Sequence, residues 1–220
     1  MGFLVSGHLG LEFVKIVFLQ APEKLENPMK QIVFATHNRN KISEIKPLLP
    51  KALRLISLDE IGCVEAIEET ADTLEGNARI KAGYIWKYFH YNCFADDTGL
   101  EVEALKGAPG VYSARFAGPG AGAEANMEKL LTLMRDAPTR KARFRTVIAL
   151  VLQGQYYFFE GVVNGEILKV PRGGGGFGYD PIFQPEGSSL SFAQMPLEEK
   201  NKISHRSRAI EKFCAFLENS

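Results

Sequence analysis

The chain has 220 residues, and its 45% hydrophobic and 24% charged residues are the balance of an ordinary globular protein. Its 26 basic and 26 acidic residues give a formal net charge of zero, which speaks against a nucleic-acid partner but not against a small anion held by a local cluster of cations. Cys63, Cys93 and Cys214 lie far apart without a zinc-type pattern. Sparse free thiols are typical of a reducing compartment, so we expect a cytoplasmic protein.

Residues 1–28 differ in character from the rest of the chain. The apolar segment from Phe3 to Leu19 is interrupted by polar residues, which speaks against a membrane span, and it lacks the basic start and cleavage site of a signal peptide. A linker containing proline and glutamate then leads to Met29, which directly precedes a strand-like segment. We therefore expect a poorly ordered extension over 1–28 and a folded domain over 29–220.

From Met29 onward, hydrophobic periodicity predicts helices interleaved with strands. The predicted strands cover 31–35, 53–58, 92–95, 100–105, 143–152 and 156–163. The predicted helices cover 41–49, 72–90, 124–134 and a C-terminal segment after Ser204. This alternation, with a hairpin-rich middle, predicts an α/β fold built on a mixed sheet.

Local signals refine these boundaries. Pro47 should kink or shorten the first helix, and Asp72 with Glu75 forms a possible capping box for the second. A polar turn is expected after Ala95, between the third and fourth strands. Asn164-Gly165 is a strong hairpin signal, and Gly154 separates the two preceding strands.

The first segment with functional potential is Thr36 to Lys41, which follows a strand and opens a helix. Free N–H groups and the positive dipole end of a helix suit a phosphate, and Lys41 adds a charge. A capped helix with a solvated lysine would give the same pattern. No Walker A motif occurs in the chain, so any phosphate site here is of another kind.

The second segment is acidic and comes from two separate places. Glu68-Glu69 precedes a helix, where acids are common in any case, and Asp96-Asp97 is predicted to end a strand. Because side chains alternate along a strand, the adjacent aspartates are expected to do different jobs. Carboxylates from two loops, completed by water and phosphate oxygens, are what Mg²⁺ prefers.

Two further segments lie in the C-terminal third. In the glycine-rich run 175–181, glycines permit close backbone approach, Phe177 offers a stacking face for a base, and Asp180 offers an acceptor for a ring N–H. A flexible loop would show a similar composition. In the basic run 200–206, cations sit at a helix start, which favours an anionic or carbonyl-bearing partner over a merely solvated run.

Together these segments resemble the inosine triphosphate pyrophosphatase family, which removes noncanonical purine nucleotides. The matching residues occur in order between Met29 and Ser220. They are Thr36-x-Asn38-x-x-Lys41, Glu69-Thr70 with Asn77-Ala78 and Lys81, Ala95-Asp96-Asp97-Thr98-Gly99-Leu100, Gly110-Val111-Tyr112-Ser113-Ala114-Arg115, Gly175 to Phe183, and Glu199-Lys200 with Ser204-His205-Arg206. Each piece is weak alone, but the ordered set is specific.

The resemblance implies hydrolysis of ITP, dITP or XTP to a monophosphate and pyrophosphate by an elongated two-lobed α/β homodimer with a cleft between its lobes. It implies that Glu69 and Asp97 hold Mg²⁺ and that Asp97 is the candidate general base. The implied phosphate-binding residues are Thr36, His37, Asn38, Arg39, Asn40, Lys41 and Lys81. Other implied substrate contacts are Thr98 and, around the base, Phe177, Gly178, Tyr179, Asp180, Lys200, His205 and Arg206.

Some residues depart from the family pattern. His37 replaces a usual glycine, Thr98 stands where serine is common, and Gln194 replaces a frequent glutamate. Two other functions share the overall logic. A pyrophosphatase for modified pyrimidines or methylated bases would lack the Gly-Phe-Gly-Tyr-Asp and Ser-His-Arg segments. A nucleotide-binding module without turnover would not need the acid cluster.

Overall fold

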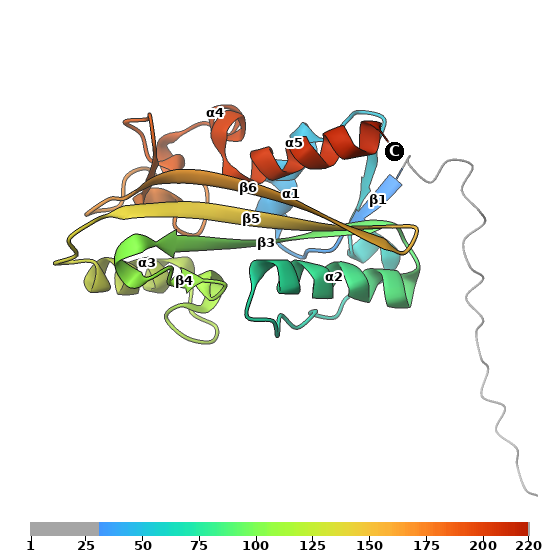
Figure 1. The fold of residues 1–220 in the computed structure, drawn as a ribbon, viewed down its shortest axis with the longest axis horizontal. Coiled ribbons are helices and arrows are strands. Elements are labelled where there is room, and N and C mark those ends of the chain that lie inside the picture. The colour runs from blue at the N-terminus through green and yellow to red at the C-terminus, as the bar shows by residue number, and fades with distance from the viewer. Residues whose placement is uncertain (1–30, 220) are drawn as a thin grey trace, which may run out of the picture.

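The computed structural model describes residues 31–219 and shows one seven-stranded sheet with helices on both faces (Figure 1). The strands are β1 Gln31–Phe34, β2 Arg54–Ile56, β3 Cys93–Val102, β4 Pro109–Gly110, β5 Lys141–Leu152, β6 Gln155–Ile167 and β7 Phe183–Pro185. Their order is β2-β1-β3-β5-β6-β7, with β4 beside β3. Because β1 runs parallel to β2 and β3 while the other pairs are antiparallel, the expected mixed sheet is confirmed.

The helices are α1 Arg39–Ile45, α2 Leu74–Phe89, α3 Ala123–Leu133, α4 Leu197–Ile203 and α5 His205–Glu218. Short 3₁₀ helices fill connections at Lys46–Leu48, Asp59–Ile61, Glu103–Leu105, Ser113–Arg115, Asp180–Ile182 and Phe192–Gln194. In Figure 1, α2 and α3 lie on one side of the strands, and α1, α4 and α5 lie on the other. Within the described residues, no helix is long and apolar enough to cross a membrane.

The molecule is elongated because β5 and β6, of 12 and 13 residues, run through both lobes (Figure 1). In the first lobe the sheet is covered on one face by α2, through buried residues such as Ile85, and on the other by α5, through residues such as Phe213. The second lobe has its own core around α3 and β7, which includes Phe183. Each fully buried side chain of this size contributes roughly 1.5–3 kcal/mol, so both lobes hold substantial cores. The predicted two-lobed architecture is confirmed.

The polar turn expected after Ala95 is wrong. Residues 93–102 form one continuous strand that pairs residue by residue with β5, Asp96 opposite Ile148 and Thr98 opposite Thr146. The aspartates therefore lie in mid-strand. The hairpin expected at Asn164-Gly165 is wrong as well, because both residues continue β6. Glycine is required at 165 by close approach, since a Cβ there would collide with the carbonyl oxygen of Gln184 on β7.

Three helix boundaries test the signals for helix ends. Pro47 falls in a 3₁₀ turn directly after α1, so the helix is shortened as predicted. The capping box of Asp72 and Glu75 is wrong, because Thr73 is the N-cap of α2 and its hydroxyl accepts from the N–H of Gly76 at 3.0 Å. Ser204 caps α5 as predicted, accepting from the N–H of Ser207 at 3.1 Å.

One edge of β3 stays open in the middle of the molecule. β1 leaves β3 after Phe94, and β4 joins it only at Leu100. Between these points, residues 96–99 have β5 as their only sheet neighbour within the described chain. The chain that leaves β1 turns into α1 beside this gap, so polar side chains from β3 and from the turn meet there.

Candidate active site

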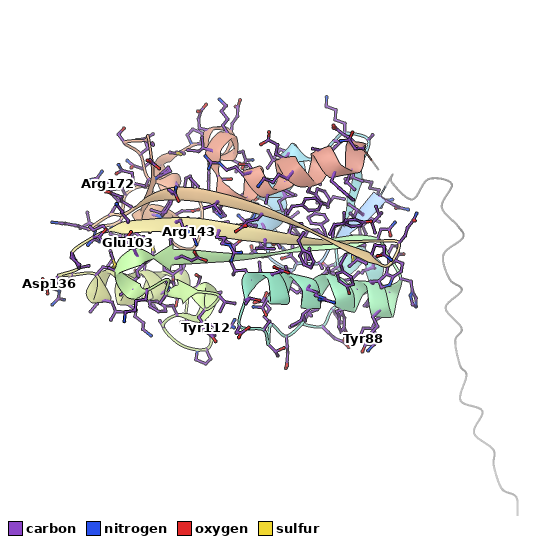
Figure 2. All side chains as sticks on the ribbon, in the orientation of Figure 1. Tyr88, Glu103, Tyr112, Asp136, Arg143 and Arg172 are labelled. Carbon is purple, nitrogen blue, oxygen red and sulfur yellow. The ribbon has the colours of Figure 1, made fainter. Side chains whose placement is uncertain are left out.

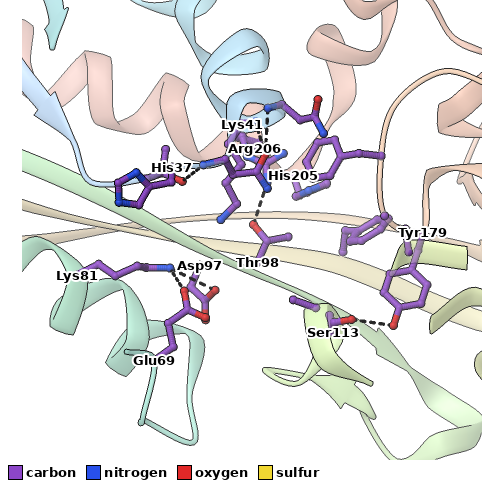
Figure 3. A pocket seen from close by; sticks show the side chains of 18 of the residues that line it. His37, Lys41, Glu69, Lys81, Asp97, Thr98, Ser113, Tyr179, His205 and Arg206 are labelled. Carbon is purple, nitrogen blue, oxygen red and sulfur yellow. Dashed lines mark hydrogen bonds and ion pairs between the residues drawn. The ribbon is translucent and has the colours of Figure 1, made fainter. Parts of the chain in front are cut away.

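A cavity of about 520 Å³ lies at this open edge, between the two lobes (Figure 3). Its walls come from the turn after β1, the segment before α2, the middle of β3, the glycine-rich loop and the start of α5. The predicted site residues all line it except Arg39, which is exposed at the start of α1. The fold thus brings together segments that are separated by as many as 170 positions in the sequence, from Thr36 to Arg206.

The turn from Thr36 to Lys41 is shaped by side-chain hydrogen bonds. Asn38 caps α1, since its side-chain Oδ1 accepts from the N–H of Asn40 at 3.0 Å and of Lys41 at 3.3 Å. The hydroxyl of Thr36 accepts from the N–H of Asn38 at 3.2 Å. Lys41 is not solvated, since its ammonium lies 2.8 Å from Asp96 Oδ1. Burial lowers the pKa of Lys41, and Asp96 opposes that shift. The segment is both a capped helix start and a cationic wall.

The adjacent aspartates of β3 face opposite ways, as strand alternation predicts. Asp96 is fully buried beside Lys41 and Arg206, with Oδ2 at 3.3 Å from the Arg206 Nε. Burial opposes ionisation of Asp96, but these two cations outweigh it and hold the pKa of Asp96 well below its usual range. Asp96 is therefore a permanent anion that fixes two cations.

Asp97 points toward α2 instead. Its Oδ2 accepts from the Asn77 amide at 3.2 Å, and its Oδ1 lies 3.6 Å from the Lys81 ammonium, which also donates to Glu69. Burial raises the pKa of Asp97, Lys81 pulls it down and Glu69 pushes it up; the net shift is upward. A carboxylate with a raised pKa is a better proton acceptor than a free one.

Glu69 and Asp97 converge on Lys81 from two segments (Figure 3). The described residues contain no group of three or more acidic, histidine or cysteine side chains arranged for a metal. A dedicated protein cage is thus absent from this part of the chain. Mg²⁺ usually takes one or two carboxylates and completes its shell with water and substrate phosphates, so this donor pair fits that ion.

A buried cluster of charges runs from the turn after β1 to the other end of the cavity. Glu44 of α1 accepts from Lys200 at 2.7 Å and also pairs with Arg206. Lys200 also contacts Asp180 Oδ2 at 2.6 Å. With Lys41 and Asp96, three cations face three anions, and each cation has at least one acidic partner.

The glycine-rich loop is bound to this cluster. Asp180 Oδ2 accepts from the Phe177 N–H at 2.8 Å, and burial raises the pKa of Asp180 although Lys200 opposes the shift. The Phe177 ring lies 5.3 Å from the Lys200 ammonium and 5.5 Å from the Arg206 guanidinium carbon. Across the cavity, the Tyr179 hydroxyl donates to the Ser113 carbonyl at 2.9 Å. These contacts hold the loop against the charge cluster as a wall of the cavity.

Comparison with known proteins assigns this arrangement to a family. The family model of the Ham1 family matches residues 32–216. The chain belongs to the Ham1 family.

Relatives of this Ham1 protein match it over almost their whole length. The dITP/XTP pyrophosphatase of Christiangramia forsetii is 56% identical over 187 residues, which cover 85% of this chain and 98% of that protein. The dITP/XTP pyrophosphatase of Flavobacterium johnsoniae is 51% identical over 187 residues, with 85% and 97% coverage. The solved structure of a Ham1 protein from Coxiella burnetii is 38% identical, has a TM-score of 0.81, and covers 87% of this chain and 100% of that one.

Within the Ham1 cavity, His205 has an unusual environment. Its ring stacks on Phe144 at a centroid distance of 4.6 Å, and its Nδ1 has no hydrogen-bond partner among the described residues. Burial lowers the pKa of His205 well below its usual range, and Arg206 and Lys200 lower it further. His205 is therefore neutral in the folded protein.

Glu44 is a residue of this Ham1 site that the sequence patterns do not reveal. The helical pattern of α1 assigns Ile42 and Ile45 to the core and gives Glu44 no role. A signal does exist, because the cations of the run 200–206 need anions once they are buried. Gln194, which the family pattern leaves unassigned, completes a capping box with Ser191 and does not line the cavity.

Proposed function

We propose that this Ham1 protein hydrolyses the noncanonical purine nucleoside triphosphates ITP, dITP and XTP to the monophosphate and pyrophosphate, using Mg²⁺. The observation that carries the proposal is the convergence of Glu69, Asp97 and Lys81 beside the turn from Thr36 to Lys41, opposite the buried charge cluster. A triphosphate fits a cavity with this cationic and metal-accepting end. The relatives from Flavobacterium johnsoniae and Christiangramia forsetii are named dITP/XTP pyrophosphatase, which supports the same substrate class.

Glu69 and Asp97 would hold Mg²⁺, which when bound there offsets phosphate charge. Lys41 and Lys81 add cationic charge on the phosphate path, and Thr36 supplies a hydroxyl. Asp97 takes a proton from the attacking water. The water oxygen forms a bond to phosphorus at the α–β linkage. The bridging P–O bond breaks, and pyrophosphate leaves with the electron pair of that bond on its oxygen.

Base selection takes place at the other end. A guanidinium has five N–H donors on three nitrogens. In Arg206 each nitrogen makes one hydrogen bond, to Asp96, Glu44 and Thr98 respectively. We propose that a remaining donor of Arg206 meets the 6-keto oxygen of hypoxanthine or xanthine while Phe177 contacts the ring. Adenine carries an amino group at that position and would leave the donor unmatched, which a buried site penalises strongly.

Product analysis with inosine triphosphate tests this function. Phosphorus NMR of a reaction containing ITP and Mg²⁺ should show inosine monophosphate and pyrophosphate, and EDTA should stop the reaction. Formation of a diphosphate and orthophosphate would overturn the proposal. We further propose a homodimer that acts in the cytoplasm, and light scattering coupled to size-exclusion chromatography tests the assembly.

A further inference from the structure

Arg115 differs from the other cations around the cavity in how it is held. Lys41 and Lys200 contact their carboxylates at 2.8 and 2.6 Å. The Arg115 Nη1 lies 3.8 Å from Glu69 Oε2, which is too long for a hydrogen bond. Its side chain is 34% exposed, whereas that of Lys200 is 3% exposed. Arg115 is thus a loosely paired charge beside Glu69, which lines the cavity.

The backbone at Arg115 is held by hydrogen bonds of its neighbours, whereas its guanidinium makes longer contacts. It ends the 3₁₀ helix Ser113–Arg115 of the second lobe, where the Ser113 hydroxyl accepts from Leu100 N–H at 2.9 Å and donates to the Gly110 carbonyl at 2.6 Å. The guanidinium carbon lies 5.2 Å from the centre of the Tyr112 ring, whose place is labelled in Figure 2. The side chain of Arg115 therefore extends from the second lobe to Glu69 of the first lobe.

Glu69 is shared between two cations from opposite sides. Lys81 donates to Oε1, and Arg115 approaches Oε2. A divalent cation on Glu69 and Asp97 would take these oxygens and repel the guanidinium. Arg115 would then be left with its donors unmatched, a short distance from any phosphate that shares the same metal.

We propose that Arg115 binds the pyrophosphate end of the substrate: Glu69 holds the guanidinium until a divalent cation claims that carboxylate, and Arg115 then donates to the β- and γ-phosphate oxygens. This inference rests on the proposed function, because it takes the triphosphate to lie along Lys81. Arginine suits the role, since its planar fork matches phosphate oxygens with two parallel hydrogen bonds.

The proposal predicts two effects of opposite sign in one variant. Isothermal titration calorimetry should show that Arg115→Gln binds Mg²⁺ alone about two- to fivefold more tightly, because a competing cation has left Glu69. Inorganic pyrophosphate, titrated at saturating Mg²⁺, should bind about tenfold more weakly, as expected for the loss of a charged hydrogen bond. Arg115→Lys should recover part of the pyrophosphate affinity, since the charge is kept and the fork is lost.

Arg143→Gln is the matched control. Arg143, labelled in Figure 2, pairs with Glu101 at 2.6 Å on an exposed part of the sheet, so the same change removes an arginine–glutamate pair outside the cavity. It should alter neither affinity. An unchanged melting temperature would show that Arg115→Gln is folded, and inosine monophosphate, titrated in the same way, should bind it as tightly as it binds the unaltered protein.

Each outcome bears on the proposal. Unchanged pyrophosphate affinity in Arg115→Gln, or equal weakening of pyrophosphate and inosine monophosphate, would overturn it. Weaker binding of Mg²⁺ alone would also overturn it, because Arg115 would then be a support for Glu69 and not its competitor. If the unaltered protein fails to release pyrophosphate from ITP, the proposed function falls, whereas the calorimetric comparison still reports on Arg115.

Discussion

Replacing Glu44 by glutamine tests whether the buried charge cluster holds the site together. The side chain of Glu44 is 6% exposed and serves both Lys200 and Arg206, so water cannot screen the loss of its charge. Three anions now face three cations, and the variant would leave one positive charge uncompensated. Removing one partner of a buried pair destabilises a protein by about 3–5 kcal/mol. Because Lys200 keeps Asp180 and Arg206 keeps Asp96, we expect the lower end, about 3 kcal/mol.

Urea unfolding followed by circular dichroism measures this loss directly. A loss of that size corresponds to a melting temperature lowered by about 6–12 °C in a domain of this length. Glu60→Gln is the matched control, since Glu60 forms an exposed pair with Arg54 at 2.9 Å and its loss should stay within about 1 kcal/mol. If Glu44→Gln destabilised the protein no more than Glu60→Gln does, the buried cluster would not be a structural element of the site.

Three other variants test separate parts of the site. Asp97→Asn should lower ITP turnover at least about a hundredfold while the protein stays folded, because a general base contributes about that much; steady-state kinetics with a melting curve checks both. His205→Phe should reduce the acid sensitivity of the fold. The buried imidazole stays neutral in the folded protein, whereas in the unfolded chain it takes up a proton below its ordinary pKa of about 6.5. Acidification therefore favours the unfolded chain, and the stability present above that pH is lost. Between pH 7.5 and pH 5, the free energy of unfolding should fall by about 2 kcal/mol less in the variant than in the unaltered protein. His37→Gly removes a single exposed contact with the Glu65 carbonyl at 3.2 Å, so kcat/KM for ITP should change by no more than about fivefold; a hundredfold loss would place His37 in the chemistry.

The sequence predicts the architecture well where short-range physics decides it. Apolar periodicity locates the helices, Pro47 ends the first one, and strand alternation separates the jobs of Asp96 and Asp97. Pairing between distant segments is where prediction fails. The polar run after Ala95 is typical of a turn, but β5 supplies a full set of partners that keeps it extended.

The same limit applies to the site. The predicted residues, apart from Arg39, line one cavity. They could be predicted because the motif segments occur in the order typical of the family. Which charges contact which could not be predicted. Glu44 lies 162 positions from Arg206 in the sequence, and only the packing of α1 against α5 brings the two together. The sequence also does not show that the guanidinium of Arg206 already donates to three protein side chains, which leaves fewer N–H groups for a nucleobase.

We propose that the cavity releases pyrophosphate from purine nucleotides with a 6-keto group and disfavours adenine. The most direct measurement is kcat/KM for ITP and for ATP, determined side by side with pyrophosphate detection at saturating Mg²⁺. We expect kcat/KM for ITP to exceed that for ATP by at least about tenfold, the ratio given by one unmatched donor of about 1.4 kcal/mol or more. Equal values for the two nucleotides, or a preference for ATP, would contradict it.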